Sequence, residues 1–188
     1  MSTISDDLSG LLAARLKGER ERRSWSLADL GARAGVSKAM LSKIEREEVS
    51  PTASILSRIA TAFDITLAEL LTKERAASTR LMRANEQPSW QDPDTHYTRR
   101  QVFLDPKSPL EIVEVRFPAG ASVSFPASTY ELARHVVWVL SGQLTIIEGG
   151  EEHVLRTGDR LEFGAPSDVT YRNASGAPCR YLVTLLRM

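Results

Sequence analysis

Side chains that could contact DNA bases cluster in one short segment of the sequence: Ser37, Lys38, Ala39, Ser42 and Lys43. A lysine can donate to O6 or N7 of guanine, a serine can donate to or accept from several bases, and an alanine methyl group can contact thymine. A helix over about residues 38–46 would place these side chains on its exposed face. We therefore predict that this helix enters the major groove by its N-terminal residues.

Contacts with the DNA backbone are expected from Ser26, Arg46 and Thr52. Ser26 precedes a predicted helix whose first backbone N–H groups have no intrahelical partner and could bind a phosphate. Arg46 or Thr52 could hold the backbone on the other side. Such contacts position a protein on DNA but carry no sequence information.

A turn and a preceding helix must hold the reading helix. Ser26 is typical of a helix N-cap, and Asp29 stands at the third helical position, where it completes a capping box. This pattern predicts a helix over about residues 27–34 that ends at Gly35, because glycine adopts the left-handed conformation at low cost. Ser37 then caps the reading helix, which gives the helix-turn-helix arrangement.

Three further helices complete a predicted five-helix bundle. Leucines at helical spacing line one face of the first helix: Leu8, Leu11, Leu12 and Leu16. Ser50 followed by Pro51 is typical of a cap with proline in the first helical position, and predicts the start of a fourth helix. The buried face of that helix would carry Ile55, Ile59 and Phe63. A short fifth helix is expected over about residues 67–71.

The segment from about residue 8 to residue 72 resembles the XRE/Cro-type helix-turn-helix family. The matching positions are Arg15-Leu16, Arg20, Ser26-Leu27, Asp29-Leu30, Ala34-Gly35-Val36-Ser37, Leu41-Ser42, Ile44-Glu45-Arg46, Ser50-Pro51-Thr52 and Leu56. The resemblance implies an all-α, lambda-repressor-like DNA-binding domain in which Arg20 pairs with Glu45 rather than with DNA. Leu27 departs from the family, where a polar residue often follows the cap. Glu47-Glu48 replaces the usual glycine, and we expect this acidic pair to influence which backbone contacts form.

Beyond residue 80 the apolar pattern acquires a period of two. Short β-prone runs cover residues 97–103, 111–117, 122–125, 136–140, 143–148, 153–156, 160–163, 169–172 and 181–185. Turns that contain glycine, such as those at Gly142 and Gly158, separate many of these runs. Many short strands in this arrangement predict an all-β sandwich or barrel.

Residues 110–187 resemble a cupin barrel, the double-stranded β-helix. The resemblance is carried by Pro118-x-Gly120, by the run 136–142 that ends in Gly142, and by a second motif from Gly158-Asp159 to Asn173. It implies a sensor or dimerisation domain in a chain of this order and length.

Cupins usually bind a divalent metal through histidines and a glutamate, ligands that suit iron, manganese, zinc or nickel. Here His135 stands at the glutamate position, and Val169 stands at the histidine position of the second motif. We therefore expect no metal cofactor. A rebuilt site that uses His135 and Glu131 is the alternative.

A barrel without a metal could still bind a small molecule, because side chains alternate between interior and exterior along each strand. His135 should share one face with Val137 and Val139, and it is the first candidate for a ligand contact. The alternative is a buried histidine that bonds to a hydroxyl such as that of Tyr130 or Tyr171.

Arginines and tyrosines supply the other candidate ligand contacts. Arg99, Arg100 or Arg116 could bind a carboxylate through a bidentate guanidinium, or could lie on the surface. Tyr97, Tyr130 and Tyr171 are expected to line the pocket or to pack in the core.

The composition is ordinary for a soluble protein, with 24 basic and 24 acidic side chains in 188 residues. Any affinity for phosphate must therefore come from local placement of charge. The single cysteine, Cys179, excludes an internal disulfide and is expected to be a packed small side chain. Asp6 and Asp7 stand where a signal peptide carries bases, and no apolar run approaches the roughly 20 residues of a membrane span. We expect a cytoplasmic protein with no membrane partner.

These observations predict a DNA-binding domain over residues 8–72, a linker over 73–79 and a cupin-like domain over 80–188. The leading hypothesis is a transcriptional regulator, not an enzyme, that binds double-stranded operator DNA as a homodimer. The resemblance implies an effector related to amino-acid, sulfur or polyamine metabolism. One alternative is a metal-dependent cupin enzyme with a DNA-binding appendage. The other is a constitutive repressor whose barrel only dimerises.

Overall fold

The computed structural model describes residues 4–72 and 80–187, with side chains from Gly10 onward in the first range. The chain divides into two compact units, residues 1–75 and 76–188. The predicted linker over residues 73–79 lies outside the described residues, as does the side chain of Leu8. No helix in the described ranges is long and apolar enough to cross a membrane.

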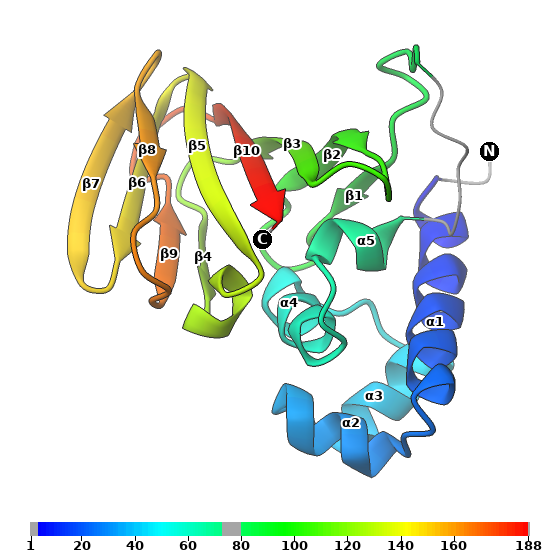
Figure 1. The fold of residues 1–188 in the computed structure, drawn as a ribbon. Coiled ribbons are helices and arrows are strands. Elements are labelled where there is room, and N and C mark those ends of the chain that lie inside the picture. The colour runs from blue at the N-terminus through cyan, green and yellow to red at the C-terminus, as the bar shows by residue number, and fades with distance from the viewer. Residues whose placement is uncertain (1–3, 73–79, 188) are drawn as a thin grey trace. The chain divides into compact units, whose positions relative to one another are not determined.

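Five helices form the N-terminal unit, as predicted (Figure 1): α1 (Ile4–Arg22), α2 (Leu27–Ala34), α3 (Lys38–Glu45), α4 (Ala53–Ala62) and α5 (Leu67–Leu71). Each of the first four contributes a fully or almost fully buried aliphatic side chain to a common core, for example Leu16, Leu30, Leu41 and Leu56. The helix-turn-helix formed by α2 and α3 begins where its caps predicted, because Ser26 and Ser37 are the two N-caps.

The start of α4 differs from the prediction. The N-cap is Thr52 rather than Ser50, and the first helical hydrogen bond runs from the Leu56 N–H to the Thr52 carbonyl at 2.9 Å. Pro51 is buried, and Thr52 has extended backbone with a φ of −74° and a ψ of 162°, so the helix begins at Ala53. The buried side chains of α4 are Ala53, Leu56, Ser57, Ile59 and Ala60, followed by Phe63. Leu56 therefore takes the place predicted for Ile55, which is half-buried.

Two antiparallel sheets form the C-terminal unit (Figure 1). The six-stranded sheet has the order β1 (Ser89–Gln91), β2 (Thr98–Leu104), β3 (Leu110–Phe117), β10 (Cys179–Arg187), β5 (Ala133–Ser141) and β8 (Arg160–Glu162). The four-stranded sheet has the order β4 (Ser122–Phe125), β9 (Val169–Arg172), β6 (Gln143–Glu148) and β7 (Glu151–Arg156). A 3-10 helix, η1 (Ala127–Tyr130), lies between β4 and β5 in the sequence. The nine predicted strands are confirmed, whereas the three-residue β1 was not predicted.

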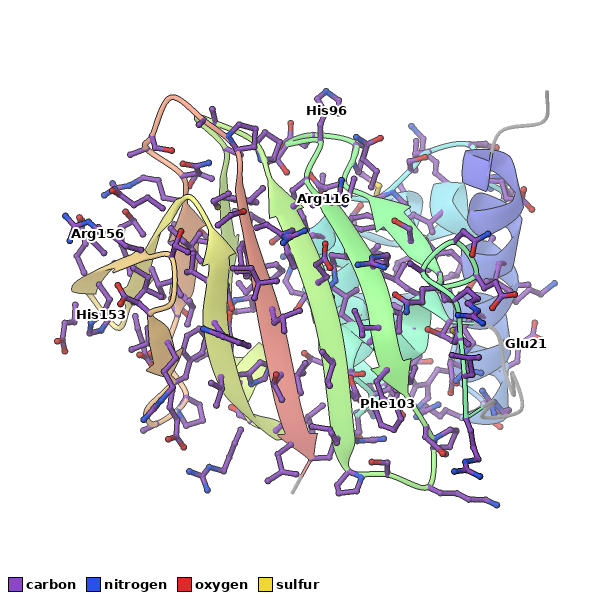
Figure 2. All side chains as sticks on the ribbon, turned by 90° about the horizontal axis from the view of Figure 1, so that it is seen from above. Glu21, His96, Phe103, Arg116, His153 and Arg156 are labelled. Carbon is purple, nitrogen blue, oxygen red and sulfur yellow. The ribbon has the colours of Figure 1, made fainter. Side chains whose placement is uncertain are left out.

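The six-stranded sheet has a buried inner face and a more exposed outer face, seen from above in Figure 2. Along β5 the side chains of His135, Val137 and Val139 are buried on the inner face, while Trp138 between them is exposed. Neighbouring strands keep this register, because Val183 of β10 pairs with Val137 and with Val113 of β3. The alternation predicted for β5 is therefore confirmed, and it directs His135 into the core.

Candidate nucleic-acid interface and barrel interior

The predicted base-contacting side chains lie on the solvent side of α3. Ser37, Lys38, Ala39 and Lys43 are exposed and Ser42 is half-buried, whereas Leu41 and Ile44 of the same helix are buried. The Ser37 hydroxyl caps the helix by accepting a hydrogen bond from the Met40 N–H at 3.2 Å. The exposed side of α3, with its cap, thus presents two ammonium groups and two hydroxyls, with Lys38 in the first turn and Lys43 in the last.

Close backbone packing fixes the turn between α2 and α3. Gly35 has a φ of +62°, the left-handed conformation expected of it. A Cβ on Gly31 would lie 2.7 Å from the Val36 carbonyl oxygen, so only glycine permits this approach. Arg58 of α4 donates from Nη1 to the Gly35 carbonyl at 3.0 Å. Sequence reasoning missed Gly31 and Arg58, because both contacts depend on tertiary packing.

Arg20 and Glu45 form the ion pair that the family resemblance implied. Nε of Arg20 donates to one carboxylate oxygen of Glu45 at 2.7 Å and Nη2 donates to the other at 2.9 Å. The two side chains are only 13% and 10% exposed, and Nη1 of Arg20 also donates to the Trp25 carbonyl. The hydrogen bond to Glu45 raises the pKa of Arg20. This pair ties α3 to α1 and is unavailable to DNA.

The N-terminus of α2 already has its own cap. Asp29 N donates to the Ser26 hydroxyl at 3.2 Å, and the Asp29 carboxylate accepts from the Ser26 N–H at 2.8 Å and from the Ser26 hydroxyl at 2.7 Å. These hydrogen bonds from Ser26 hold the pKa of Asp29 below its usual range. A phosphate at this end of α2 would therefore lie near a negative charge. At α4, by contrast, the Thr52 side chain makes no capping hydrogen bond.

Arg46 lies at the C-terminal end of α3, where acidic and hydroxyl side chains hold it. Its guanidinium donates to both carboxylate oxygens of Glu48, and Nη1 donates to the Ser42 hydroxyl. Both Arg46 and Glu48 are exposed. The hydrogen bond from Arg46 holds the pKa of Glu48 below its usual value. Glu48, a member of the acidic pair that departs from the family pattern, is thus hydrogen-bonded to the guanidinium that was predicted to contact the DNA backbone.

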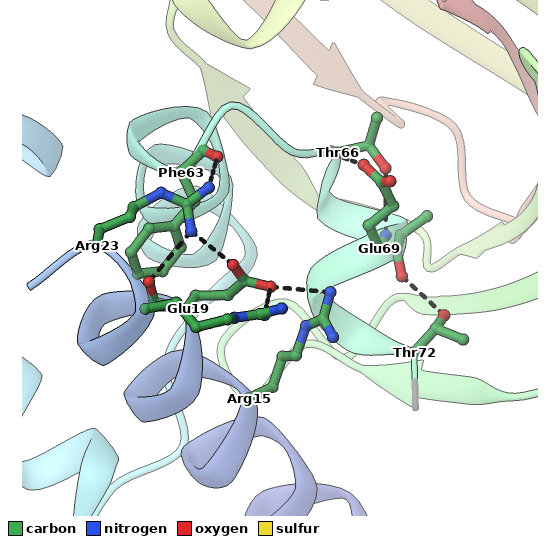
Figure 3. A network of polar contacts seen from close by, with 9 residues as sticks. Arg15, Glu19, Arg23, Phe63, Thr66, Glu69 and Thr72 are labelled. Carbon is green, nitrogen blue, oxygen red and sulfur yellow. Dashed lines mark hydrogen bonds and ion pairs between the residues drawn. The ribbon is translucent and has the colours of Figure 1, made fainter. Parts of the chain in front are cut away.

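A polar network joins α1 to the end of α4 (Figure 3). Glu19 is 4% exposed; it accepts from Arg23 at 2.6 Å and forms an ion pair with Arg15 at 2.9 Å. Arg23 also donates to the Phe63 carbonyl, and its guanidinium lies over the Phe63 ring at 5.0 Å. The Trp25 ring stacks on Phe63 at 5.9 Å. Arg15 of α1 and Arg23, which directly follows α1, therefore stabilise the bundle rather than forming a free cationic face.

His135 is buried in the interior of the C-terminal unit. Its Nδ1 lies 2.9 Å from the Ala133 carbonyl oxygen, so Nδ1 carries the proton in this contact. The imidazole lies between Tyr130, at a centroid distance of 4.9 Å, and Phe163, on which it stacks at 6.1 Å. Burial lowers the pKa of His135 to about 4. The partner of Nδ1 is thus a backbone carbonyl rather than a tyrosine hydroxyl.

Further aromatic rings extend from His135 through the interior. Tyr171 stacks on Tyr181 at 5.9 Å, Tyr181 meets Phe117 edge-on at 6.2 Å, and Phe117 contacts Tyr97 at 5.5 Å. Burial raises the pKa of all four interior tyrosines, Tyr97, Tyr130, Tyr171 and Tyr181. Their hydroxyls therefore stay protonated at neutral pH and can donate hydrogen bonds.

The three candidate arginines lie on different faces of the six-stranded sheet. Arg99 pairs with the buried Val115 and belongs to the inner face. Arg100 pairs with Glu114 on the outer face, where it donates to the Glu114 carboxylate and, at 2.8 Å, to Gln87. Arg116 also lies on the outer face, with its side chain 69% exposed (Figure 2). The structure therefore groups Arg99, and neither of the others, with His135 and the tyrosines.

The interior does not fit a metal ion of the kind that cupins usually bind. Residues 4–72 and 80–187 contain no group of three or more His, Cys, Asp and Glu side chains that could hold one. Val169 is buried and offers no donor, and Glu131 is exposed. The interior polar groups suit hydrogen bonding to a ligand rather than metal coordination.

Cys179 and Asn173 have structural surroundings. Cys179 is buried, and burial raises the pKa of its thiol to about 11. A Cβ on Gly142 would lie 2.9 Å from the Cys179 Cβ and 2.9 Å from the Pro178 carbonyl oxygen, so glycine at position 142 permits this close approach. Asn173 is fully buried and donates to the carbonyls of Pro118 and Ala177 at 3.1 and 2.9 Å. These residues join the turns at one end of the sandwich.

Family models match both units. A helix-turn-helix model matches residues 16–70, and a cupin-domain model matches residues 113–185. The chain is 32% identical over 170 residues to the HTH-type transcriptional regulator SutR of Escherichia coli K12. This match covers 89% of this chain and 90% of that protein. The chain is also 32% identical over 62 residues to the HTH-type transcriptional regulator SinR of Bacillus subtilis 168. This match covers 32% of this chain and 56% of that protein.

One solved structure has the same fold over almost the whole chain. It is an HTH_3 family transcriptional regulator from Vibrio cholerae, with a TM-score of 0.79 and 23% sequence identity. The match covers 96% of this chain and 97% of that one. The order of a helical unit followed by a β unit is therefore shared by an independently determined structure.

Proposed function

This chain belongs to the family of HTH-type transcriptional regulators that carry a C-terminal cupin domain, and on that premise we propose that it controls transcription in response to a small molecule. In this proposal residues 8–72 bind operator DNA, residues 73–79 link the domains, and residues 80–188 bind the effector and dimerise. Its site of action is the cytoplasm, where its DNA partner is found. No catalytic activity is part of the proposal.

The exposed face of α3 is the observation that carries the DNA-binding proposal. Lys38, Ala39 and Lys43 project from a helix whose opposite face is buried. Lys38 and Lys43 supply donors for guanine, and Ser37 and Ser42 supply smaller polar contacts. Ser26, Arg46 and Thr52 remain proposed backbone contacts, with Arg46 dependent on release from Glu48.

The buried cluster in the C-terminal unit supports a sensing role. His135, Tyr130 and Tyr171 place hydrogen-bonding groups inside the sandwich, where they could contact a bound small molecule. These residues, together with Arg99, are the proposed effector contacts. Arg116 is not included, because it lies on the outer face.

We propose that the protein acts as a homodimer through an outer apolar patch of the six-stranded sheet. The patch consists of Phe103, Ile112, Val136, Trp138, Leu182 and Leu186. Thr184 lies between Ile112 and Val136 within this patch. Ion pairs at its margin, such as Arg134 with Glu162 and Arg100 with Glu114, give it the charged rim of a protein interface. A second copy is the natural occupant, since a single reading helix buries little DNA surface and two-fold symmetry supplies a second half-site.

The proposal is tested by selecting operator fragments from genomic DNA with the full chain, and then measuring affinity by fluorescence anisotropy. Lys43→Ala should weaken binding to the selected operator by about tenfold or more and change the preferred bases, because it removes a base contact. Lys107→Ala, an exposed lysine of the C-terminal unit, is the matched control and should leave the affinity unchanged. Selection of no preferred sequence, or equal effects of the two variants, would refute the DNA-reading role.

A screen of thermal stability against metabolites separates the sensor from a constitutive repressor. An effector at 100 times its dissociation constant should stabilise the domain that binds it by about 2.7 kcal/mol. An effector must also change operator affinity, since binding without that change would leave only the constitutive function.

A further inference from the structure

Arg99 is a cation on the inner face of the sheet. It lies two residues after Tyr97, on the same face of the chain at the start of β2, and opposite the buried Val115. Within residues 80–187 Arg99 makes no ion pair with a carboxylate, whereas its neighbour Arg100 binds Glu114. Arg99 is half-buried, so an anion that reaches its guanidinium from the interior gains a charge-assisted contact that is partly shielded from water.

A buried hydroxyl lies beside Arg99. Tyr97 is 2% exposed, and its hydroxyl makes no hydrogen bond of standard geometry, although the Arg99 guanidinium is near enough to act on the pKa of this hydroxyl through a side-chain contact. Buried polar groups are nearly always paired, and an unpaired one commonly marks a ligand or functional position. The Arg99 charge also acts on Tyr130, His135, Tyr171 and Tyr181, which places the guanidinium in electrostatic range of the whole cluster.

His135 supplies a hydrogen-bond acceptor, whereas Arg99 and the Tyr97 hydroxyl are donors. Because its Nδ1–H donates to the Ala133 carbonyl and the ring is neutral, Nε2 carries a lone pair. No hydrogen bond to Nε2 is present among the described residues. The interior therefore offers a cation, hydroxyl donors and one neutral acceptor. It also holds the fully buried carboxylate of Glu111, which lies four residues along β3 from the Val115 that pairs with Arg99.

We propose that this interior binds a small monocarboxylate that also carries a hydrogen-bond donor, with Arg99 and the Tyr97 hydroxyl on the carboxylate and His135 Nε2 accepting from the donor. The inference rests on the proposed sensing function and names the chemical class of its effector. Amino acids and hydroxy acids belong to this class. Polyamines do not, because their ammonium groups would meet Arg99, and sulfur compounds belong to it only if they carry a carboxylate.

The test uses calorimetric titration of the full chain with 2-amino and 2-hydroxy monocarboxylic acids, the primary amide of each acid, and di- and polyamines. At least one acid should bind, and its amide should bind at least about tenfold more weakly, because a bidentate charge-assisted contact is lost. Arg99→Gln should weaken binding of the acid by a similar factor. Arg116→Gln, which removes an exposed arginine of the same sheet, should not.

Tyr97→Phe provides a second variant that removes only the unpaired hydroxyl, and it should lower acid affinity while keeping the fold. Binding of an amide or a polyamine as tightly as the acid would overturn the inference, as would unchanged affinity in Arg99→Gln or a panel in which no acid binds. Operator affinity is measured in parallel on every variant. If the unmodified chain binds its operator but no acid, only the proposed effector class is rejected. If the unmodified chain recognises no operator, the proposed function as a transcriptional regulator is rejected.

Discussion

Arg46 donates two hydrogen bonds to Glu48, from Nε at 2.6 Å and from Nη2 at 3.0 Å, at the exposed end of the helix proposed to read DNA. This bidentate geometry is the one that a guanidinium uses for a phosphate. Glu48 follows Arg46 by only two residues in the sequence. Its carboxylate therefore competes with a DNA phosphate for the Arg46 guanidinium. DNA binding through Arg46 must therefore displace a carboxylate.

Glu48→Gln should raise operator affinity by releasing Arg46. We expect about threefold tighter binding near 0.1 M salt, because an exposed ion pair is weak. The slope of log affinity against log salt should become steeper by about 0.9, the value for one additional phosphate contact. Fluorescence anisotropy titrations over a series of salt concentrations measure both quantities.

The matched control for this change is Glu152→Gln. Glu152 is an exposed carboxylate paired with Arg172 at 2.9 Å in the C-terminal unit, so its replacement alters net charge equally. It should leave the salt slope unchanged. If both variants bind with the same increased affinity, net charge rather than Arg46 is responsible.

The parts of the fold that could be predicted from the sequence are those set by local geometry. The capping box of Ser26 and Asp29 and the left-handed Gly35 act within a few residues, and both are confirmed. The start of α4 could not be predicted from its Ser-Pro pattern, because Pro51 is packed in the core and Thr52, not Ser50, is the N-cap. Local rules thus located α2 and α3 but failed where tertiary packing competes with a cap.

The candidate ligand site was predictable to a smaller extent. The inward direction of His135 followed from alternation along one strand, whereas three arginines remained equivalent in the sequence. Only the register of β2 with β3 separates Arg99 from Arg100, and that ladder shifts between Gln101 and Phe103. A one-residue shift reverses the face of each side chain, so alternation alone could not assign these positions.

Glu45→Gln should destabilise the helical unit by about 2 kcal/mol, because it leaves the largely buried Arg20 guanidinium without its counter-charge. Hydrogen–deuterium exchange of the α3 amides in the full chain measures the loss. Glu21→Gln is the control, since the Glu21 carboxylate also lies near Arg20, at 3.8 Å, but is 56% exposed. Equal exchange rates in the two variants would show that the Arg20–Glu45 pair adds no stability.

His135 should make the C-terminal unit less stable in acid. Its pKa is about 4 in the folded protein and about 6.5 when unfolded, so the unfolded chain binds more protons between these values. The stabilisation is complete above pH 6.5 and is lost as the pH falls toward 4. Between pH 7 and pH 5 the loss should reach about 2 kcal/mol.

Hydrogen exchange of the β5 and β10 amides at several pH values, corrected for intrinsic exchange, measures this dependence. His135→Asn, which keeps a donor for the Ala133 carbonyl, should remove it. His153→Asn changes a half-buried histidine on β7 and should preserve the dependence of the unmodified chain. A pH dependence that survives in His135→Asn would assign the effect to other groups.

Leu186→Glu should dissociate the proposed homodimer. Leu186 is 46% exposed on the outer apolar patch, and a carboxylate there would be desolvated if a second copy covered it. Val154→Glu places the same charge at a 45% exposed aliphatic residue on β7 of the other sheet, and should leave the dimer intact. Sedimentation equilibrium reports the mass of each variant, and operator titration should show weaker binding by the monomer, because one reading helix has lost its partner. Dissociation by Val154→Glu alone would move the interface to the four-stranded sheet, and a dimer that survives in both variants would exclude the patch.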